Sequence, residues 1–230
     1  MSTSRLQCQL NNISTVSNAV SYLNLTEFVY FFGGLSCKKL QKYRLHDDSD
    51  FIVLGEKNYL KLTSYLCRNC SFREVTIPFF KGFSVKFYEN TLQKNSGTVE
   101  IRYLEPCSGG WKFKIPFFAY PFTKFKSLGI PNIVFKNTST IKINGVELKT
   151  LPIEYSYILK SYGRTNKDIS DVEILKSIIN KQLVRNIKEQ AKKCGMSLVM
   201  NRVLFNYCRS RCTYGFDKKQ YLELNAPVKV

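Results

Sequence analysis

Two short segments decide the fold of this chain: FFGGLS at residues 31–36 and RLHDDSDFIVL at residues 44–54. The first is an apolar strand that runs into a Gly33-Gly34 turn, and the second starts a new strand with Asp48 and Asp50. Because side chains alternate between the faces of a strand, these two carboxylates point the same way. They suit a divalent cation between them, and a glycine turn lets the backbone approach phosphate closely. Together the segments indicate chemistry on a nucleotide.

The composition predicts a folded protein with a strongly basic surface. Of the 230 residues, 44% are hydrophobic and 14% aromatic, which is enough for a packed core. No run approaches the roughly 18 apolar residues of a membrane helix, and residues 1–12 lack the apolar stretch of a signal peptide. We therefore expect a soluble, cytoplasmic protein with no membrane partner. Lysine and arginine number 35 against 17 acidic residues, a formal net charge of +18.

The positive charge is concentrated near the C-terminus. Residues 176–230 hold 12 basic and 3 acidic side chains, which is half of the net charge. Such a surface attracts polyanions by counterion release, and interleaved aromatics such as Tyr207, Tyr214 and Phe216 suit base stacking. The alternative is a solvated helix face with aromatic core residues. The expected nucleic-acid-binding residues are Lys188, Lys192, Lys193, Arg202, Arg209, Arg211, Lys218 and Lys219.

The cysteines allow a second kind of metal site. Cys67 and Cys70 have zinc-ligand spacing, and together with Cys208 and Cys212 they would make a four-cysteine set. The two pairs are far apart in the sequence, however, and neither lies in a glycine-rich knuckle. Without a secretory signal, free thiols are the default, so we expect ordinary thiols.

The remaining pattern predicts an α+β fold, with a mixed sheet flanked by helices and followed by a helical lobe. Strands are expected over 27–32, 50–54, 73–79, 83–88, 98–104, 111–118, 133–135, 140–143 and 146–151. Helices are expected over 13–23, 36–43, 59–67 and 153–161. A last helix is expected to open at a Ser170-x-x-Glu173 capping box and to end near Gly195. We place a catalytic core at 1–151 and a basic helical lobe at 152–230.

The order of these motifs along the chain is similar to that of a known protein family. Gly33 and Gly34 follow a strand, a short helix comes next, and Arg44, His46, Asp48 and Asp50 then form an Arg-x-His-x-Asp-x-Asp run. Downstream, Lys160 lies on an expected helix and is followed by Lys167-Asp168 and Asp171. Over residues 27–185 this pattern resembles the nucleotidyltransferase superfamily with a polymerase-β-like core. It is most similar to the minimal members, the lincosamide-type and the toxin or abortive-infection nucleotidyltransferases.

The resemblance implies a role for each matching residue. Asp48 and Asp50 would be catalytic ligands of Mg²⁺ or Mn²⁺, and an NTP would be the donor substrate. The expected nucleotide-binding residues are Gly33, Gly34, Ser36, Arg44, His46 and Lys160. Alternatives remain: a plain tight turn at the glycines, exposed or capping carboxylates at 48 and 50, a surface histidine, and an Arg44 that pairs with an aspartate. Lys167 to Asp171 we interpret as more structural than catalytic.

One departure from the family pattern concerns the third carboxylate. It is commonly an Asp on a neighbouring strand, and no Asp occurs between Asp50 and Asp168. Glu100, in the expected strand over 98–104, is the best candidate, either as a metal ligand or as the base for an acceptor hydroxyl. Its side chain is longer by one methylene, so the geometry of the metal or the base is expected to differ.

The leading hypothesis is therefore a magnesium-dependent nucleotidyltransferase that moves a nucleoside monophosphate from an NTP to RNA, with a tRNA-like 3′ end as the acceptor. A cationic antibiotic would favour an acidic pocket, whereas RNA suits a net charge of +18. The second hypothesis is the same chemistry on a small molecule or a protein hydroxyl. The third is a catalytically silent fold that binds nucleic acid or a partner protein.

Overall fold

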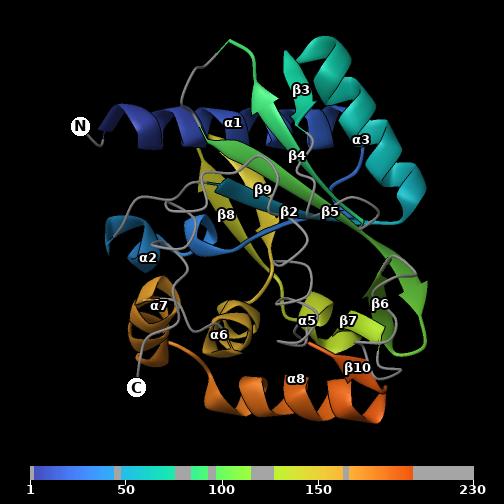
Figure 1. The fold of residues 1–230 in the computed structure, drawn as a ribbon, viewed down its shortest axis with the longest axis vertical. Coiled ribbons are helices and arrows are strands. Elements are labelled where there is room, and N and C mark those ends of the chain that lie inside the picture. Colours follow the sequence, from blue (N-terminus) through green and yellow to red (C-terminus); the bar gives the residue numbers. More distant parts are fainter. Residues whose placement is uncertain are drawn as a thin grey trace, which may run out of the picture.

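In a computed structural model, the chain folds into a mixed β-sheet with helices packed on both faces (Figure 1). The structure describes residues 3–43, 48–75, 84–92, 97–114, 127–162 and 166–198. The α+β class and the mixed sheet flanked by helices, both predicted from the sequence, are confirmed.

The described part of the chain forms one sheet in the order β10-β7-β6-β5-β2-β1-β9-β8, with the β3–β4 hairpin attached to β5. Strand β2 is antiparallel to β1 and parallel to β5, so it lies in the middle of the sheet. The strands are β1 Val29–Phe32, β2 Asp48–Leu54, β3 Phe72–Val75, β4 Val85–Asn90, β5 Thr98–Cys107, β6 Gly110–Phe113, β7 Ser127–Pro131, β8 Ser139–Ile143, β9 Val146–Thr150 and β10 Met196–Ser197.

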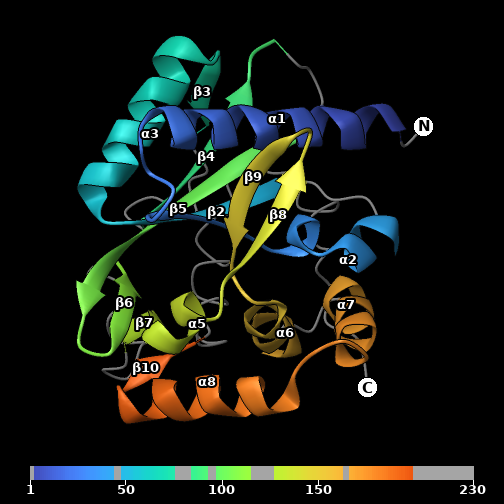
Figure 2. The same ribbon diagram turned by 180° about the vertical axis from the view of Figure 1, so that it is seen from behind.

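The helices divide between the two faces of the sheet. In Figures 1 and 2, α1 and α3 lie on one side of the strands, and α5, α6 and α8 lie on the other. Helix α7 packs on α6 and α2. The helices are α1 Thr3–Tyr22, the 3₁₀ turn η1 Gly34–Ser36, α2 Lys38–Tyr43, α3 Glu56–Asn69, α5 Asn132–Lys136, α6 Ile153–Tyr162, α7 Asn166–Lys176 and α8 Lys181–Lys193.

Alternation along the strands produces two hydrophobic cores. On β1, Phe31 packs into the core under α1 and α3, whereas Phe32 packs into the core shared with α6 and α8. On β2, Ile52 and Leu54 belong to this second core. Because Asp48 and Asp50 have the same parity as Ile52, they lie on the α6 side of the sheet.

The secondary structure predicted over residues 133–135 and 170–195 is wrong. Residues 133–135 form helix α5 and not a strand, because the chain turns after Pro131 and Gln190 accepts the Ile133 N–H through its side-chain oxygen. An apolar run this short does not distinguish a strand from a helix. The single helix expected to start at Ser170 is in fact two helices. Helix α7 begins at Asn166 and ends at Lys176, and α8 begins at Lys181.

The break between α7 and α8 has a local cause. The Asn180 side chain accepts hydrogen bonds from the N–H groups of Gln182 and Leu183, at 3.0 and 3.1 Å, and so caps α8. Asn is among the preferred residues at this position. The sequence pattern joined the two helices because their apolar residues continue at helical spacing.

The second core contains residues from both sides of position 151, among them Ile52, Tyr155 and Ile187. The C-terminal segment also adds β10, which is parallel to β7. A boundary at 151 between two domains stays a prediction. Among the described residues, no helix has both the length and the apolar character needed to cross a membrane.

Candidate metal centre

Three carboxylates meet where β2 and β5 begin. In the parallel register of these strands, Asp50 is the partner of Glu100 and Asp48 is the partner of Thr98. One oxygen from each of Asp48, Asp50 and Glu100 lies within 4.8 Å of the others. Among the described residues, this is the one group of three or more His, Cys, Asp or Glu side chains that could hold a metal ion. The structure therefore brings together the three residues expected to be catalytic.

The donor set fits a hard divalent cation. All three ligands are carboxylates, and Mg²⁺ and Mn²⁺ prefer oxygen ligands. Glu100 is buried, at 5% exposure, while Asp48 and Asp50 are partly exposed. The cluster is thus anchored in the protein on the Glu100 side and open on the side of Asp48.

Gly33 makes room for this cluster. Phe32, the last residue of β1, pairs with Asp50, and Gly33 follows it with φ at 81°. A Cβ atom on Gly33 would lie 2.2 Å from Asp50 Oδ2. Only glycine fits this position without moving the carboxylate.

The glycine turn continues into η1. Its Ser36 hydroxyl donates a hydrogen bond of 2.8 Å to the Gly33 carbonyl, which holds the turn closed. The helix expected over 36–43 is accordingly divided into η1 and α2. Binding of a triphosphate by Gly33, Gly34 and Ser36 stays a prediction.

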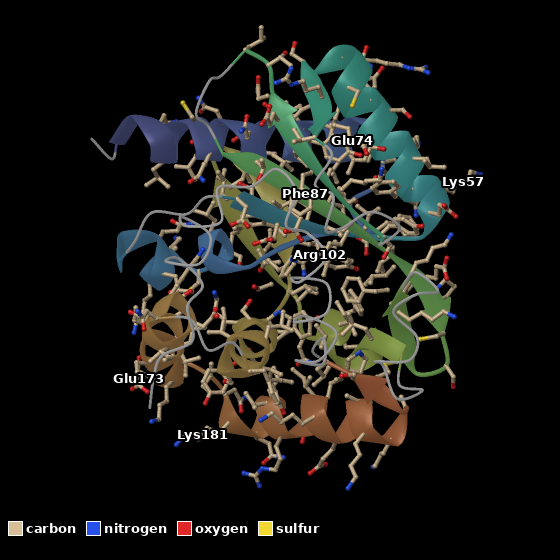
Figure 3. The ribbon with its side chains drawn as sticks, in the orientation of Figure 1. Lys57, Glu74, Phe87, Arg102, Glu173 and Lys181 are labelled. Atoms are coloured by element: carbon tan, nitrogen blue, oxygen red, sulfur yellow. The ribbon has the colours of Figure 1, made fainter. Side chains whose placement is uncertain are left out.

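The cluster contains a fourth charged residue, Arg102, that the sequence reasoning did not single out. Its guanidinium Nε donates to Glu100 Oε1, and one terminal nitrogen lies 3.8 Å from Asp50 Oδ1. The guanidinium also lies over the Phe32 ring, 5.1 Å from its centre. Figure 3 shows Arg102 near the centre of the molecule. The signal was available, because Arg102 follows Glu100 by two residues and therefore shares its face of the strand.

The charges of the cluster shift its acid–base equilibria. Burial raises the pKa of Asp50 well above its ordinary value of 3.8, and the charges of Asp48 and Glu100 raise it further, against the opposing effect of Arg102 and Lys160. Burial likewise raises the pKa of Glu100, and Arg102 opposes that shift. Although burial disfavours the cation, Glu100 and Asp50 hold the pKa of Arg102 above its ordinary value. The cluster is therefore short of positive charge.

Comparison with known proteins identifies the fold of this chain. No protein-family model matches the sequence, and no curated protein matches it at a significant level. Among solved structures, that of the lincosamide antibiotic adenylyltransferase LnuA with lincomycin bound aligns with a TM-score of 0.51 and 16% identity, over 74% of this chain and 96% of that one. The chain has the nucleotidyltransferase fold. The resemblance found in the sequence is confirmed at this level.

Two more solved structures align with it less well. The structure of ANT(2″)-Ia in complex with adenylyl-2″-tobramycin gives a TM-score of 0.41 and 16% identity, over 88% of this chain and 98% of that one. An antigenic nucleotidyltransferase-like protein from Paracoccidioides brasiliensis gives 0.47 and 15%, over 91% and 94%.

In this nucleotidyltransferase fold, Lys160 reaches the centre from α6. Its ammonium lies 2.6 Å from Asp171 Oδ2 and 3.9 Å from Asp168 Oδ1, so it links α6 to α7. Asp171 is buried, at 1% exposure. Lys160 also lowers the pKa of Asp50, which places its charge near the carboxylates. A contact between Lys160 and a nucleotide stays a prediction. Its ion pair with Asp171 was not predicted from the sequence.

Several predicted site residues fall outside the described residues. Of the nucleotide-binding set these are Arg44 and His46, and of the zinc alternative Cys208 and Cys212, while Cys67 and Cys70 are free thiols. Of the predicted nucleic-acid-binding residues, Lys188, Lys192 and Lys193 are exposed on α8. The others lie outside the described part of the chain: Arg202, Arg209, Arg211, Lys218 and Lys219.

Proposed function

We propose that this protein is a divalent-metal-dependent nucleotidyltransferase that transfers a nucleoside monophosphate from an NTP to an RNA acceptor with a tRNA-like 3′ end. The observation that carries the proposal is the Asp48–Asp50–Glu100 cluster, whose ligand oxygens lie within 4.8 Å of one another, in a chain with the nucleotidyltransferase fold.

Each carboxylate of the centre has a role in this reaction. Asp48 and Asp50, with Glu100 beside them, would hold Mg²⁺ or Mn²⁺, which supplies positive charge to the triphosphate and the departing pyrophosphate when bound. Glu100 is suited to accept the proton of the acceptor hydroxyl, because its carboxylate is held next to Asp50 at the proposed metal centre. The hydroxyl oxygen then bonds to the α-phosphorus as the bond to pyrophosphate breaks.

The residues around the centre would orient the donor. Gly33 lies beside Asp50, and the turn from Gly33 through Gly34 to Ser36 would place backbone groups against the triphosphate. Lys160 and Arg44 would add positive charge for the phosphates, and His46 would contact them.

An RNA acceptor is supported by charge. The net charge is +18, and α8 exposes Lys181, Arg185, Lys188 and Lys192 while burying Val184, Ile187 and Ala191. Those four basic residues recur at helical spacing, so they form one stripe on the outer side of the helix. We call this set, with the adjacent Lys193, the α8 basic stripe. Lys188 also lies 5.9 Å from the centre of the Tyr162 ring, which is 58% exposed.

A small-molecule acceptor is the second candidate. The solved structure of LnuA, which shares the fold, holds lincomycin. The strongly basic composition of this chain counts against a cationic antibiotic as acceptor, whereas a neutral or anionic hydroxyl compound is compatible with it.

A transfer assay with labelled donors tests the proposal. The protein is incubated with each of the four labelled NTPs, Mg²⁺ or Mn²⁺, and either total tRNA, a lincosamide or no acceptor. Label on RNA is the expected result. Label on the drug alone supports the second candidate, and the absence of transfer with every donor and metal would contradict both.

Matched variants tie the activity to the cluster. Asp48→Ala and Asp50→Ala are each expected to reduce transfer more than about 100-fold, because each removes a ligand of the catalytic cation. Glu89→Ala is the control, since Glu89 pairs with exposed Arg73 on the β3–β4 hairpin and should leave transfer unchanged. Equal activity in all three variants would assign the reaction to another site.

A further inference from the structure

Arg102 is the charged residue of the centre to which the proposed reaction gives no role. It contacts two of the three carboxylates, Glu100 directly and Asp50 at 3.8 Å. We propose that Arg102 is a positioning residue and a resident counter-charge of this centre. It holds Glu100 and Asp50 in place and competes with a divalent cation for both, so that the centre binds the metal more weakly than the carboxylates alone would. The inference rests on the proposed metal-dependent function.

The position of Arg102 is fixed from several sides. Glu100 and Arg102 lie on the same face of β5, which anchors both through the backbone pairing with β2. The Phe32 ring lies against the guanidinium at 5.1 Å from its centre. Buried Tyr155 on α6 is close enough for Arg102 to affect its pKa. A guanidinium held this way is preorganised, and its fork can contact two carboxylates at once.

The formal charges show why this matters for a metal. The three carboxylates carry three negative charges, and Arg102 brings one positive charge to them. A divalent ion then meets a net formal charge of −2 on these four groups, whereas without Arg102 it would meet −3. Removing Arg102 should therefore strengthen the attraction for the first divalent cation.

Arg102 also restricts the longer side chain of Glu100. A glutamate has one more rotatable bond than an aspartate, so its carboxylate is less fixed by the backbone. The bond from Arg102 Nε to Glu100 Oε1 removes this freedom and leaves the second oxygen of Glu100 for other partners. Loss of Arg102 should thus weaken positioning while it strengthens metal binding.

A purely structural role predicts a different result. If Arg102 only satisfies a buried carboxylate, its removal lowers stability without changing metal affinity. The two roles are therefore distinguished by the effect of an Arg102 substitution on metal affinity. This effect is measured by binding and needs no enzymatic turnover.

The test compares Mn²⁺ binding in the full-length protein and its variants, without nucleotide. Arg102→Met removes the charge and keeps the length, whereas Arg102→Lys keeps the charge but loses the fork. Mn²⁺ affinity is followed by electron paramagnetic resonance or calorimetry, and melting temperature is measured in EDTA and in Mn²⁺.

We expect Arg102→Met to melt below the wild type in EDTA, to bind Mn²⁺ about tenfold more tightly, equal to about 1.4 kcal/mol, and to gain more in melting temperature from Mn²⁺. Arg102→Lys should bind about threefold more tightly. Arg73→Met, which removes an exposed arginine of the β3–β4 hairpin, is the control and should match the wild type. Asp48→Ala should weaken Mn²⁺ binding in every background.

Equal Mn²⁺ affinity in the wild type and folded Arg102→Met overturns the inference. If that variant does not fold, Arg102→Lys decides: tighter Mn²⁺ binding supports the inference, and unchanged affinity contradicts it. Tighter Mn²⁺ binding in Arg102→Met without nucleotide transfer in the wild type would leave the inference standing and sink the proposed function. No Mn²⁺ binding in any protein would remove the metal centre and both proposals with it.

Discussion

Glu100 is the residue expected from the sequence to serve as the third carboxylate of the site. The parallel register of β2 and β5 sets it beside Asp50, and its longer side chain is held by Arg102. Glu100 therefore has a charged partner two residues along the same strand. This pairing gives Glu100 a fixed position in the cluster.

Asp50 provides a pH-dependent prediction at the same scale. Its pKa lies well above 3.8 in the folded chain because of burial and of the charges of Asp48 and Glu100. The folded state thus binds a proton more tightly than the unfolded state, so this group stabilises the fold at low pH and loses that effect as pH rises through the folded pKa. In EDTA, the melting temperature of Asp50→Asn should therefore rise relative to that of the wild type as pH increases above 3.8.

Melting curves in EDTA across this range check the sign. For a chain of this size each kcal/mol corresponds to about 2–4 °C. Glu89→Gln, at an exposed pair with Arg73, serves as the control and should follow the wild type. A difference between Asp50→Asn and the wild type that shrinks as pH rises would contradict the assignment.

At the scale of elements, the sequence predicted the helices and strands whose positions depend on hydrophobic periodicity and on glycine turns. The β1 turn, β2, β5 and α6 follow from alternating or helical patterns and from Gly33, so Asp48, Asp50 and Glu100 could be placed before the structure. Helix α5 could not, because the apolar run over 133–135 is too short and its helical state depends on a distant contact with Gln190. For the same reason the partner of Lys160 was not assigned: Asp171 meets it only when α7 packs on α6.

The break before α8 gives a prediction about Asn180. Its side chain accepts from two N–H groups of the first turn, and its own N–H donates to the buried Glu154 carboxylate at 2.7 Å. Asn180→Ala should lower the free energy of unfolding by about 1 kcal/mol, or about 2–4 °C in melting temperature. Asn180→Ser keeps an acceptor oxygen and should stay within a few tenths of a kcal/mol of the wild type. Equal losses in urea titrations of both variants would show that the cap does not stabilise α8.

At the scale of the whole molecule, the proposed sites of nucleotidyl transfer and of RNA binding lie in different places. The carboxylate centre lies at the start of β2 and β5, under α6, whereas the α8 basic stripe faces outward from the same half of the molecule. Helix α3 lies on the opposite face of the sheet and also carries exposed basic residues, including Lys57. Figure 3 shows Lys57 and Lys181 at opposite sides of the molecule. The fold therefore provides an internal control for the role of charge.

The α8 basic stripe should account for a measurable part of RNA binding. The triple variant Lys188→Ala, Lys192→Ala and Lys193→Ala is expected to weaken binding to single-stranded RNA ends. Because each lost phosphate contact reduces the slope of log K against log salt by about 0.7, the slope should fall by up to about 2. Fluorescence anisotropy over a salt series measures both quantities, and Mn²⁺ affinity should not change. A matched triple variant on α3, Lys57→Ala, Lys61→Ala and Arg68→Ala, removes the same charge from the other face. Equal losses in the two triple variants would mean that RNA responds to the net charge of +18 and not to a binding surface on α8.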